Sequence, residues 1–434
     1  MKSMRIICNR YSTRRVVLFS ILLIVFMLIT TRPMVGSWND ASRMATIESL
    51  VERRTFIIDD STFINTGDKV LIDGHFYSDK PPFPSILGAV LYLPLYHLGL
   101  ELDYGWNMAY YLLTLFTVKL FWLLGLIAFY YSLSFTRLDG RMRFLLTAAL
   151  GLASLYFSWS SAFNNHLLAA SFLSIGFAFL LEAKRSESTA KHLFLSSLFI
   201  ALAGVTDLTT AVFWAAFAVY VLVDRDLRSK IHFFRLPLLL TLAPTMIYYL
   251  HIHGSVIPVS IVRSYFEYPG SPWIEVDEFS GMYINSLPFF LSYGFKILLG
   301  SKGFLLYNPL IFVAIPGLIL EIKRKRIFSR EALTIGMASL ILYLYIALMT
   351  TNYGGGCYSI RWFVPLLPML FFFIHPLLEG RSTRYQWLLI VLGAVSIALS
   401  FLGLINPWTD PEVSEFPAMV NVKMIPDILR LLSP

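Results

Sequence analysis

The sequence predicts an all-α protein that crosses a membrane many times, through about eleven spanning helices. Its 434 residues are 57% hydrophobic and 16% aromatic but only 14% charged, and the mean hydropathy is +0.66. The apolar residues form long uncharged blocks separated by short basic clusters. Such blocks can cross about 30 Å of hydrocarbon as helices, which satisfy their own backbone hydrogen bonds. This composition excludes an ordinary soluble domain.

The basic clusters set the predicted topology. Lys2, Arg5 and Arg14 precede the first apolar block, so the amino terminus is expected in the cytoplasm and the active site on the external face. No clear small-x-small cleavage site follows that block, which favours an uncleaved anchor over a signal peptide. The expected spans occupy residues 16–31, 108–135, 144–163 and 167–182, two short passes within 193–223, then 236–251, 303–321, 332–350, a pass between 361 and 381, and 385–405.

The expected organisation is one membrane domain over residues 1–405, with an external catalytic loop at 37–107, an external loop at 252–302 and an external tail at 406–434. Residues 83–100 are apolar but contain Pro84 and Pro94, so we expect a helix in the outer interface there and not a span. Lys119 lies within an expected span and should face the protein interior or a partner.

Several function classes lack support. The net charge of +8 comes from Lys and Arg between spans, where the positive-inside rule accounts for it, so no nucleic-acid partner is expected. Cys8 and Cys357 fall on opposite sides of the membrane, which excludes a disulfide between them. No P-loop, GxGxxG, HExxH or Gly-x-Ser-x-Gly motif occurs in the right context, so no nucleotide or organic cofactor is expected.

Charges gather in the segment after the first span. Asp40 lies three residues before Arg43, so the two would share a helix face. An isolated Asp in this position is more often a helix cap or part of a surface ion pair. Asp79 and Lys80 precede Pro81 and Pro82, which fix the backbone that presents the two charges. A Lys there can bind phosphate and a carboxylate can bind a cation, although a polar turn is an equal alternative.

Three further residues are predicted on the same external side. His166 lies at the outer end of the third span, Asp207 at the turn of the short hairpin, and Arg361 after a glycine run. Each has a simpler structural role available, as a helix-terminal polar group or as an interfacial anchor. Because all three are predicted on the external side of the membrane, they are candidates for one site that binds a membrane-bound, phosphate-bearing substrate.

These motifs resemble the GT-C superfamily of membrane glycosyltransferases, and in particular its aminoarabinose transferase and protein O-mannosyltransferase branches. The similar elements are Trp38-Asn39-Asp40-Ala41-Ser42-Arg43-Met44-Ala45, Tyr77-Ser78-Asp79-Lys80-Pro81-Pro82, and the Gly-Gly-x-x-x-x-Arg element in residues 355–365. The chain departs from these relatives at Ala41 and His166, where they often carry Glu and a second Asp.

The resemblance implies a transferase that moves a sugar from a polyprenyl phosphate to an acceptor and inverts the anomeric centre. The acceptor would be a lipid, a glycan or a protein. Asp40 would be the catalytic carboxylate, Lys80 and Arg361 would hold the donor phosphate, and Asp79 would be a candidate ligand for a divalent metal. Arg43, His166 and Asp207 would complete the active site.

Two other functions compete with this one. A polymer ligase that uses a lipid-linked glycan would need the same lipid carrier. A non-enzymatic lipid or sugar transporter would place its ionisable groups near the middle of the membrane and often shows internal repeats. This chain instead gathers its acids at one membrane face and shows no convincing repeat, which favours the transferase.

Overall fold

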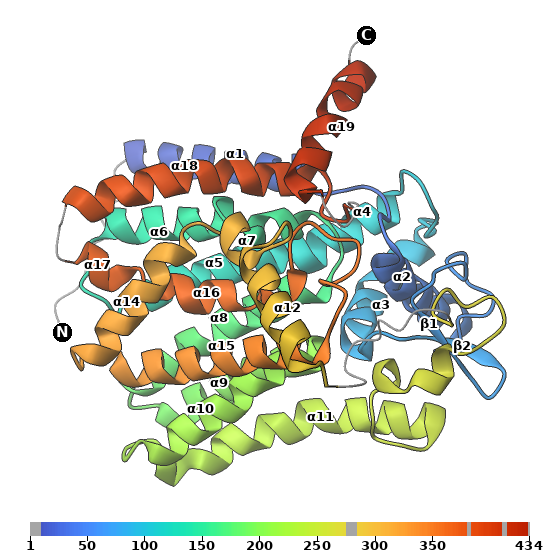
Figure 1. Ribbon diagram of the computed structural model, residues 1–434, viewed down its shortest axis with the longest axis horizontal. Coiled ribbons are helices and arrows are strands. Elements are labelled where there is room, and N and C mark those ends of the chain that lie inside the picture. Colours follow the sequence, from blue (N-terminus) through green and yellow to red (C-terminus); the bar gives the residue numbers. More distant parts are fainter. Residues whose placement is uncertain (1–9, 275–283, 380–382, 410–414, 433–434) are drawn as a thin grey trace.

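The computed structural model describes residues 10–274, 284–379, 383–409 and 415–432. Figure 1 shows a bundle of long helices with α2, α3 and a small hairpin gathered at one end, and α14 and α17 at the other. Lys2, Arg5 and Cys8, on which part of the predicted topology and the disulfide argument depend, lie outside the described residues.

Helices make up most of the described chain. The α-helices are α1 (Arg10–Ile29), α2 (Trp38–Glu48), α3 (Pro82–His97), α4 (Met108–Thr114), α5 (Leu120–Leu133), α6 (Gly140–Leu152), α7 (Leu155–Ser158), α8 (Asn165–Ala183), α9 (Thr189–Thr206), α10 (Ala211–Val223), α11 (Ile231–His253), α12 (Leu287–Leu299), α13 (Phe304–Tyr307), α14 (Ile311–Lys323), α15 (Ser329–Met349), α16 (Leu366–Phe372), α17 (His375–Leu378), α18 (Thr383–Ile405) and α19 (Pro417–Leu432). Shorter 3₁₀ and π segments are η1 (Ser49–Arg53), η2 (Leu115–Lys119), η3 (Trp159–Ser161), η4 (Leu208–Thr210), η5 (Arg228–Lys230), η6 (Val259–Ile261), η7 (Arg263–Phe266) and η8 (Arg361–Phe363).

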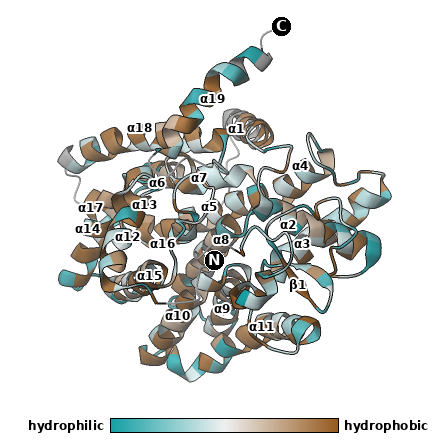
Figure 2. Ribbon diagram, turned by 45° about the vertical axis from the view of Figure 1, so that its right-hand side comes forward, coloured by the Kyte–Doolittle hydropathy of each residue, from teal (hydrophilic) through white to brown (hydrophobic). Residues whose placement is uncertain are grey.

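The apolar helices confirm the predicted class, an all-α protein with many membrane passes. Within the described residues, seven helices are long and apolar enough to cross a membrane, or eight if the bent pair Gly140–Leu152 and Leu155–Ser161 forms one span. Leu208–Val223 and Leu366–Leu378 are shorter apolar helices. The count of about eleven spans therefore stays a prediction. Figure 2 shows apolar residues along the long helices and hydrophilic residues in the loops around α2 and β1.

Helix α8 lies at the centre of the bundle and packs against α5 and α9. Two glycines permit this close packing: a Cβ at Gly125 would lie 3.1 Å from the Ser171 backbone, and one at Gly176 would lie 2.6 Å from the Ile200 side chain. Lys119 faces the interior as expected, and its Nζ donates to Ser160 Oγ at 2.7 Å and to Thr30 Oγ1 at 3.0 Å.

Two helices, α9 and α10, are present where two short passes were expected within 193–223. The chain turns between them at Asp207, which follows the last residue of α9, and a single 3₁₀ turn leads into α10. The two basic clusters flanking this apolar stretch had required such a turn, and its position brings Asp207 back to the end of the bundle that carries α2.

The segment between α2 and α3 contains an antiparallel hairpin of β1 (Lys69–Ile72) and β2 (His75–Ser78), which was not predicted from the sequence. Asp73 and Gly74 form its two-residue turn with positive φ angles of 49° and 84°, a conformation that Asp-Gly pairs favour. The predicted helix at 83–100 is present as α3, which begins at Pro82, where a missing backbone N–H costs nothing.

One segment differs from the prediction. Residues 252–302 were expected to form an external loop, but α12 (Leu287–Leu299) lies inside this range and packs against α15. The physical reason is that these residues are mostly apolar, and Leu287–Tyr307 is one of the seven helices long and apolar enough to cross a membrane.

Candidate active site

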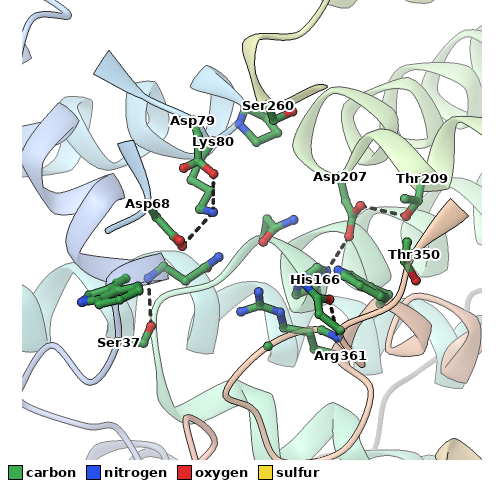
Figure 3. Close-up of a pocket in the computed structure, with 18 of the residues that line it drawn as sticks. Ser37, Asp68, Asp79, Lys80, His166, Asp207, Thr209, Ser260, Thr350 and Arg361 are labelled. Atoms are coloured by element: carbon green, nitrogen blue, oxygen red, sulfur yellow. Dashed lines mark hydrogen bonds and ion pairs between the residues drawn. The ribbon is translucent and has the colours of Figure 1, made fainter. Parts of the chain in front are cut away.

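A cavity of about 570 Å³ opens at the end of the bundle that carries α2 and the hairpin. Its walls come from α2, the residues just before α3, the first turn of α8, the turn after α9 and the loop before η8. The charged and titratable residues that line it are Arg43, Asp68, Asp79, Lys80, His166, Asp207 and Arg361 (Figure 3). The structure thus brings together every predicted site residue except Asp40, and it adds Asp68.

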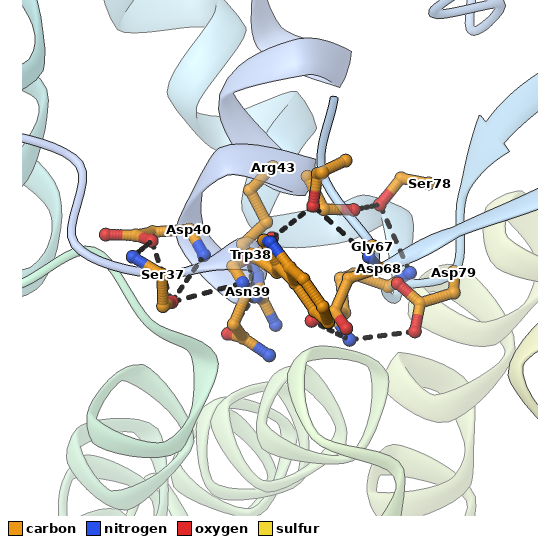
Figure 4. A network of polar contacts seen from close by, with 12 residues as sticks. Ser37, Trp38, Asn39, Asp40, Arg43, Gly67, Asp68, Ser78 and Asp79 are labelled. Atoms are coloured by element: carbon orange, nitrogen blue, oxygen red, sulfur yellow. Dashed lines mark hydrogen bonds and ion pairs between the residues drawn. The ribbon is translucent and has the colours of Figure 1, made fainter. Parts of the chain in front are cut away.

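Asp40 lies behind the cavity wall and is fully buried. It is the third residue of α2 and forms a capping box with Ser37 (Figure 4). Its Oδ1 accepts from Ser37 N at 2.7 Å and Ser37 Oγ at 2.8 Å, while Oδ2 accepts from Gly36 N at 2.9 Å and Tyr110 Oη at 3.0 Å. Burial raises the pKa of Asp40 although these four hydrogen bonds oppose the shift. The carboxylate is therefore fully occupied with holding the start of α2.

Lys80 lies between two carboxylates, with its Nζ 2.8 Å from both Asp68 Oδ2 and Asp79 Oδ2. The hairpin causes this meeting: Lys69 pairs with Ser78, so Asp68 and Asp79 are the residues immediately outside the last pair. Burial would raise the pKa of Asp68, but the ion pair with Lys80 outweighs it and lowers that pKa. Burial raises the pKa of Asp79, and the neighbouring Asp68 adds to the rise against the opposing effect of Lys80.

Asp68 and Asp79, of which Asp79 was the predicted metal ligand, already share a cation of the chain. Asp79 Oδ1 is buried without a hydrogen-bond partner, which leaves one oxygen for an additional donor or cation. The other oxygen of Asp79 and one of Asp68 are held by an ammonium group that already supplies positive charge between them. Within the described ranges, no group of three or more His, Cys, Asp and Glu side chains could hold a metal ion. A divalent metal at Asp79 therefore stays a prediction, and Lys80 occupies the position between the two acids.

Arg43 is buried in the wall of the cavity. One guanidinium nitrogen, Nη1, donates to the Asn39 carbonyl at 2.7 Å and to the Asn39 side chain, and Nη2 donates to Asn165 Oδ1 at 2.8 Å. Its Nε is buried without a hydrogen-bond partner, and no ion pair joins Arg43 to a carboxylate of the described residues. Burial lowers the pKa of Arg43 to about 10, so it stays protonated at neutral pH.

Arg361 lies at the start of η8, after a loop with positive φ angles at Tyr353, Gly354, Gly355 and Ser359. Gly354 has a φ of 86°, a conformation that favours glycine, and it lies beside the stem of Arg361. The guanidinium carbon lies 5.2 Å from the centre of the Trp408 ring. Its Nε is buried without a hydrogen-bond partner, and Arg361 has no ion pair within the described part of the chain.

His166 and Asp207 form a pair on the same cavity, with 2.6 Å between His166 Nδ1 and Asp207 Oδ2. The other carboxylate oxygen of Asp207 accepts from Thr209 Oγ1 at 2.9 Å. Burial alone would raise the pKa of Asp207, but the charge of His166 and its hydrogen bond lower it. Both side chains are almost fully buried, so the pair is held in one orientation.

Asp68 was not predicted as a site residue, and the signal that could have found it is the Asp73-Gly74 dipeptide. This pair marks a hairpin turn between runs that contain Val70, Ile72 and Phe76. A hairpin centred there places Asp68 opposite Asp79. The aromatic residues Trp38, Trp273 and Trp408, which also line the cavity, come from segments too far apart in sequence for such an argument.

The fold is similar to that of solved archaeal enzymes. The oligosaccharyltransferase AglB from Archaeoglobus fulgidus, in complex with an inhibitory peptide and a dolichol-phosphate, is 13% identical, with a TM-score of 0.50 over 90% of this chain and 56% of that one. The structure of the same organism's oligosaccharyltransferase in complex with Zn and sulfate is 13% identical, with a TM-score of 0.49 over 90% and 54%. This chain thus spans about half the length of the solved proteins that it matches.

No family model matches the sequence, and no curated protein matches it. At such low identity the structural likeness concerns the fold alone. This chain has the fold of the archaeal oligosaccharyltransferase across nearly all of its own length.

Proposed function

We propose that this protein is a membrane glycosyltransferase that takes a sugar from a polyprenyl-phosphate donor and transfers it to an acceptor, with inversion at the anomeric carbon. The observation that carries the proposal is the pair of arginines, the buried Arg43 and the half-buried Arg361, which line one cavity without a carboxylate partner within ion-pair distance among the described residues. Buried charges are normally paired, so two unpaired guanidinium groups favour an anionic ligand.

A phosphate monoester or diester suits these arginines. Guanidinium groups bind phosphate oxygens through paired hydrogen bonds, and both arginines line the cavity, each with an Nε that is buried without a hydrogen-bond partner among the described residues. The related fold of AglB was solved with a dolichol-phosphate, which is a phosphate on a polyprenyl lipid. A membrane-bound donor of this kind also explains why the chain carries no nucleotide-binding motif.

The structure changes the roles that we propose for two predicted residues. Lys80 is held between Asp68 and Asp79, so we assign the donor phosphate to Arg43 and Arg361 and give Lys80 the role of holding the two acids in place. Asp40 caps α2 and thereby positions Arg43 one turn later, which makes it a positioning residue. The free oxygen of Asp79 and the nearby Trp38 and Trp273 suit the hydroxyls and the apolar face of a sugar.

In the proposed reaction, an acceptor oxygen attacks the anomeric carbon while the bond from that carbon to the phosphate oxygen breaks. The electron pair of the broken bond stays on the phosphate, and Arg43 and Arg361 stabilise the charge that develops there. From the charge pattern we place the amino terminus in the cytoplasm and the cavity on the external face.

The test is transfer by the purified protein in lipid nanodiscs. The donors are undecaprenyl phosphate linked to radiolabelled glucose, mannose or aminoarabinose, and the acceptor is a membrane extract of the source cells. We expect label to move covalently from one donor to the extract. Vesicles that show sugar flux without covalent transfer would support the transporter instead, and release of a whole lipid-linked polymer would support the ligase.

A further inference from the structure

The His166–Asp207 pair has the geometry of a proton acceptor with a fixed orientation. Nδ1 of His166 lies 2.6 Å from Asp207 Oδ2, so a neutral imidazole carries its proton on Nδ1 and its lone pair on Nε2. Nε2 makes no hydrogen bond to a described residue. It is nevertheless not a fully buried atom, and His166 lines the cavity. The ring therefore has one nitrogen anchored and one available.

Local structure fixes both partners. Asn164 caps α8 by accepting from Leu167 N at 2.9 Å, which sets the first helical turn in which His166 lies. Asp207 terminates α9, and Thr209 holds its second oxygen. The pair thus joins the beginning of one helix to the end of its neighbour, and α8 and α9 pack closely against each other. Neither side chain can turn away without breaking a buried hydrogen bond.

The charges that act on His166 come from three elements: Asp207 after α9, Arg43 on α2 and Arg361 on η8. Burial and the two arginines oppose an imidazolium, whereas Asp207 favours it. A bound phosphate would offset the arginine charges, so donor binding would make His166 a stronger base. This coupling would activate the base only when the donor is in place.

We propose that His166 is the general base of the transfer and that Asp207 is its positioning residue; the inference rests on the proposed function. His166 Nε2 takes the proton of an acceptor hydroxyl as its oxygen forms the bond to the anomeric carbon. The bond from that carbon to the phosphate breaks at the same time, and polyprenyl phosphate leaves as the anion. The imidazolium then returns the proton to water. The acceptor class is therefore one with a hydroxyl group.

The other acids of the site are less suited to this role. Each carboxylate oxygen of Asp40 already accepts two hydrogen bonds, and the residue does not line the cavity. Asp68 and Asp79 share the ammonium group of Lys80. A base must have a free lone pair within reach of the substrate, and His166 meets this condition.

The experiment compares His166→Ala, His166→Gln and Asp207→Asn with the wild type in the nanodisc assay described above. His75→Ala is the matched control, because His75 Nδ1 also lies 2.7 Å from a carboxylate, Asp59, but that pair is exposed and does not line the cavity. Binding of undecaprenyl phosphate and thermal unfolding are measured for every variant. Transfer is measured across pH, with added imidazole, and with EDTA or Zn²⁺.

We expect both His166 variants to lose about a hundredfold or more in kcat, in line with general-base catalysis, while undecaprenyl phosphate binds within about twofold of the wild type. The acid limb of the pH profile should vanish in His166→Ala, and imidazole should restore part of its rate. Asp207→Asn should lose about tenfold and move the acid limb to lower pH, because the imidazolium loses its counter-charge. His75→Ala should match the wild type.

The failures are distinguishable. If the wild type transfers sugar but His166→Ala and Asp207→Asn keep its rate and its acid limb, the general-base proposal is wrong and the proposed function stands. If the wild type needs Zn²⁺ and His166→Ala loses only the response to the metal, His166 is a metal ligand and not the base. If the wild type transfers from no donor, both proposals fall.

Discussion

Buried charges occur at both ends of the helix bundle, but they are arranged differently. At the end that carries α14 and α17, each buried acid lies close to a cation: Glu321 is 2.9 Å from Arg326, Glu331 is 2.6 Å from Lys184, and Asp224 is 3.2 Å from Arg330. At the cavity end, Asp68 and Asp79 share the single ammonium group of Lys80, whereas Arg43 and Arg361 have no acid within ion-pair distance among the described residues.

The difference separates two uses of charge. In a buried ion pair, each charge is compensated within the fold, and removing one partner leaves a costly unpaired charge. An unpaired buried cation costs stability until a ligand supplies the missing anion, so such a group indicates function. The contrast predicts that variants at the far end change stability, while variants of the cavity arginines change transfer.

The largest effect is expected for Arg361→Gln. Loss of a cation that stabilises the departing phosphate should lower kcat/KM by about 10²–10³, with little change in the temperature of unfolding because no ion pair within the described residues is broken. Arg330→Gln removes the same charge at the far end and should leave transfer per folded molecule unchanged. Equal losses of transfer in Arg361→Gln and Arg330→Gln would contradict the proposed difference between the two ends of the bundle.

Glu331→Gln tests the structural end. Glu331 is fully buried and accepts from Lys184 at 2.6 Å and from Tyr220 Oη at 2.7 Å. The variant leaves Lys184 without its charge partner and should lower the free energy of unfolding by roughly 2 kcal/mol, less than for a fully buried pair because Lys184 is partly exposed. Denaturation in detergent measures this loss. A stable variant without transfer would contradict the assignment.

Asp40→Asn tests whether Asp40, at the cavity end, has a structural or a catalytic role. The amide would turn its NH₂ group toward groups that are themselves donors, so the cap of α2 should weaken and the free energy of unfolding should fall by about 1–2 kcal/mol. We expect transfer to fall by less than in His166→Ala. A well-folded Asp40→Asn protein that binds donor but has lost all transfer would restore Asp40 as the catalytic carboxylate.

The smallest effect is the pH dependence of Asp68→Asn. The folded-state pKa of Asp68 lies below its ordinary value of 3.8, so its ionised form stabilises the fold above that pH, and the contribution is lost as the pH falls through the folded pKa. The variant should be about 1 kcal/mol less stable at pH 7, with the difference vanishing in acid. Asp79→Asn should cost less, because burial raises the pKa of Asp79 and makes its ionisation less favourable than that of Asp68. Unfolding in detergent at several pH values measures both differences.

Much of this architecture follows from charge and apolar length in the sequence. The basic clusters around residues 193–223 required two passes with a turn near Asp207, and the prolines before α3 predicted where that helix begins. The same reasoning brought His166, Asp207, Arg361, Lys80 and Arg43 to one side, and the cavity contains all of them.

The roles of individual groups could not be predicted in the same way, because they depend on hydrogen-bond partners distant in sequence. Tyr110 supplies the fourth donor to Asp40 from 70 residues away, and Asn165 reaches Arg43 from 122 residues away. The sequence shows that Lys80 follows Asp79, but only the hairpin register brings Asp68 to the same ammonium group.

Because of the hairpin, the site depends on the number of residues between Asp68 and Asp79. Side chains alternate between the two faces of a strand, so adding or removing a single residue between Asp68 and Asp79 would shift one acid out of register with the other. Adding one residue to each strand would keep the two acids opposite each other but would turn both to the other face of the hairpin. Length is therefore constrained in this short stretch even where its residues touch no ligand. Among related chains, the number of residues between these two acids should mark a working site better than the identity of the residues in between.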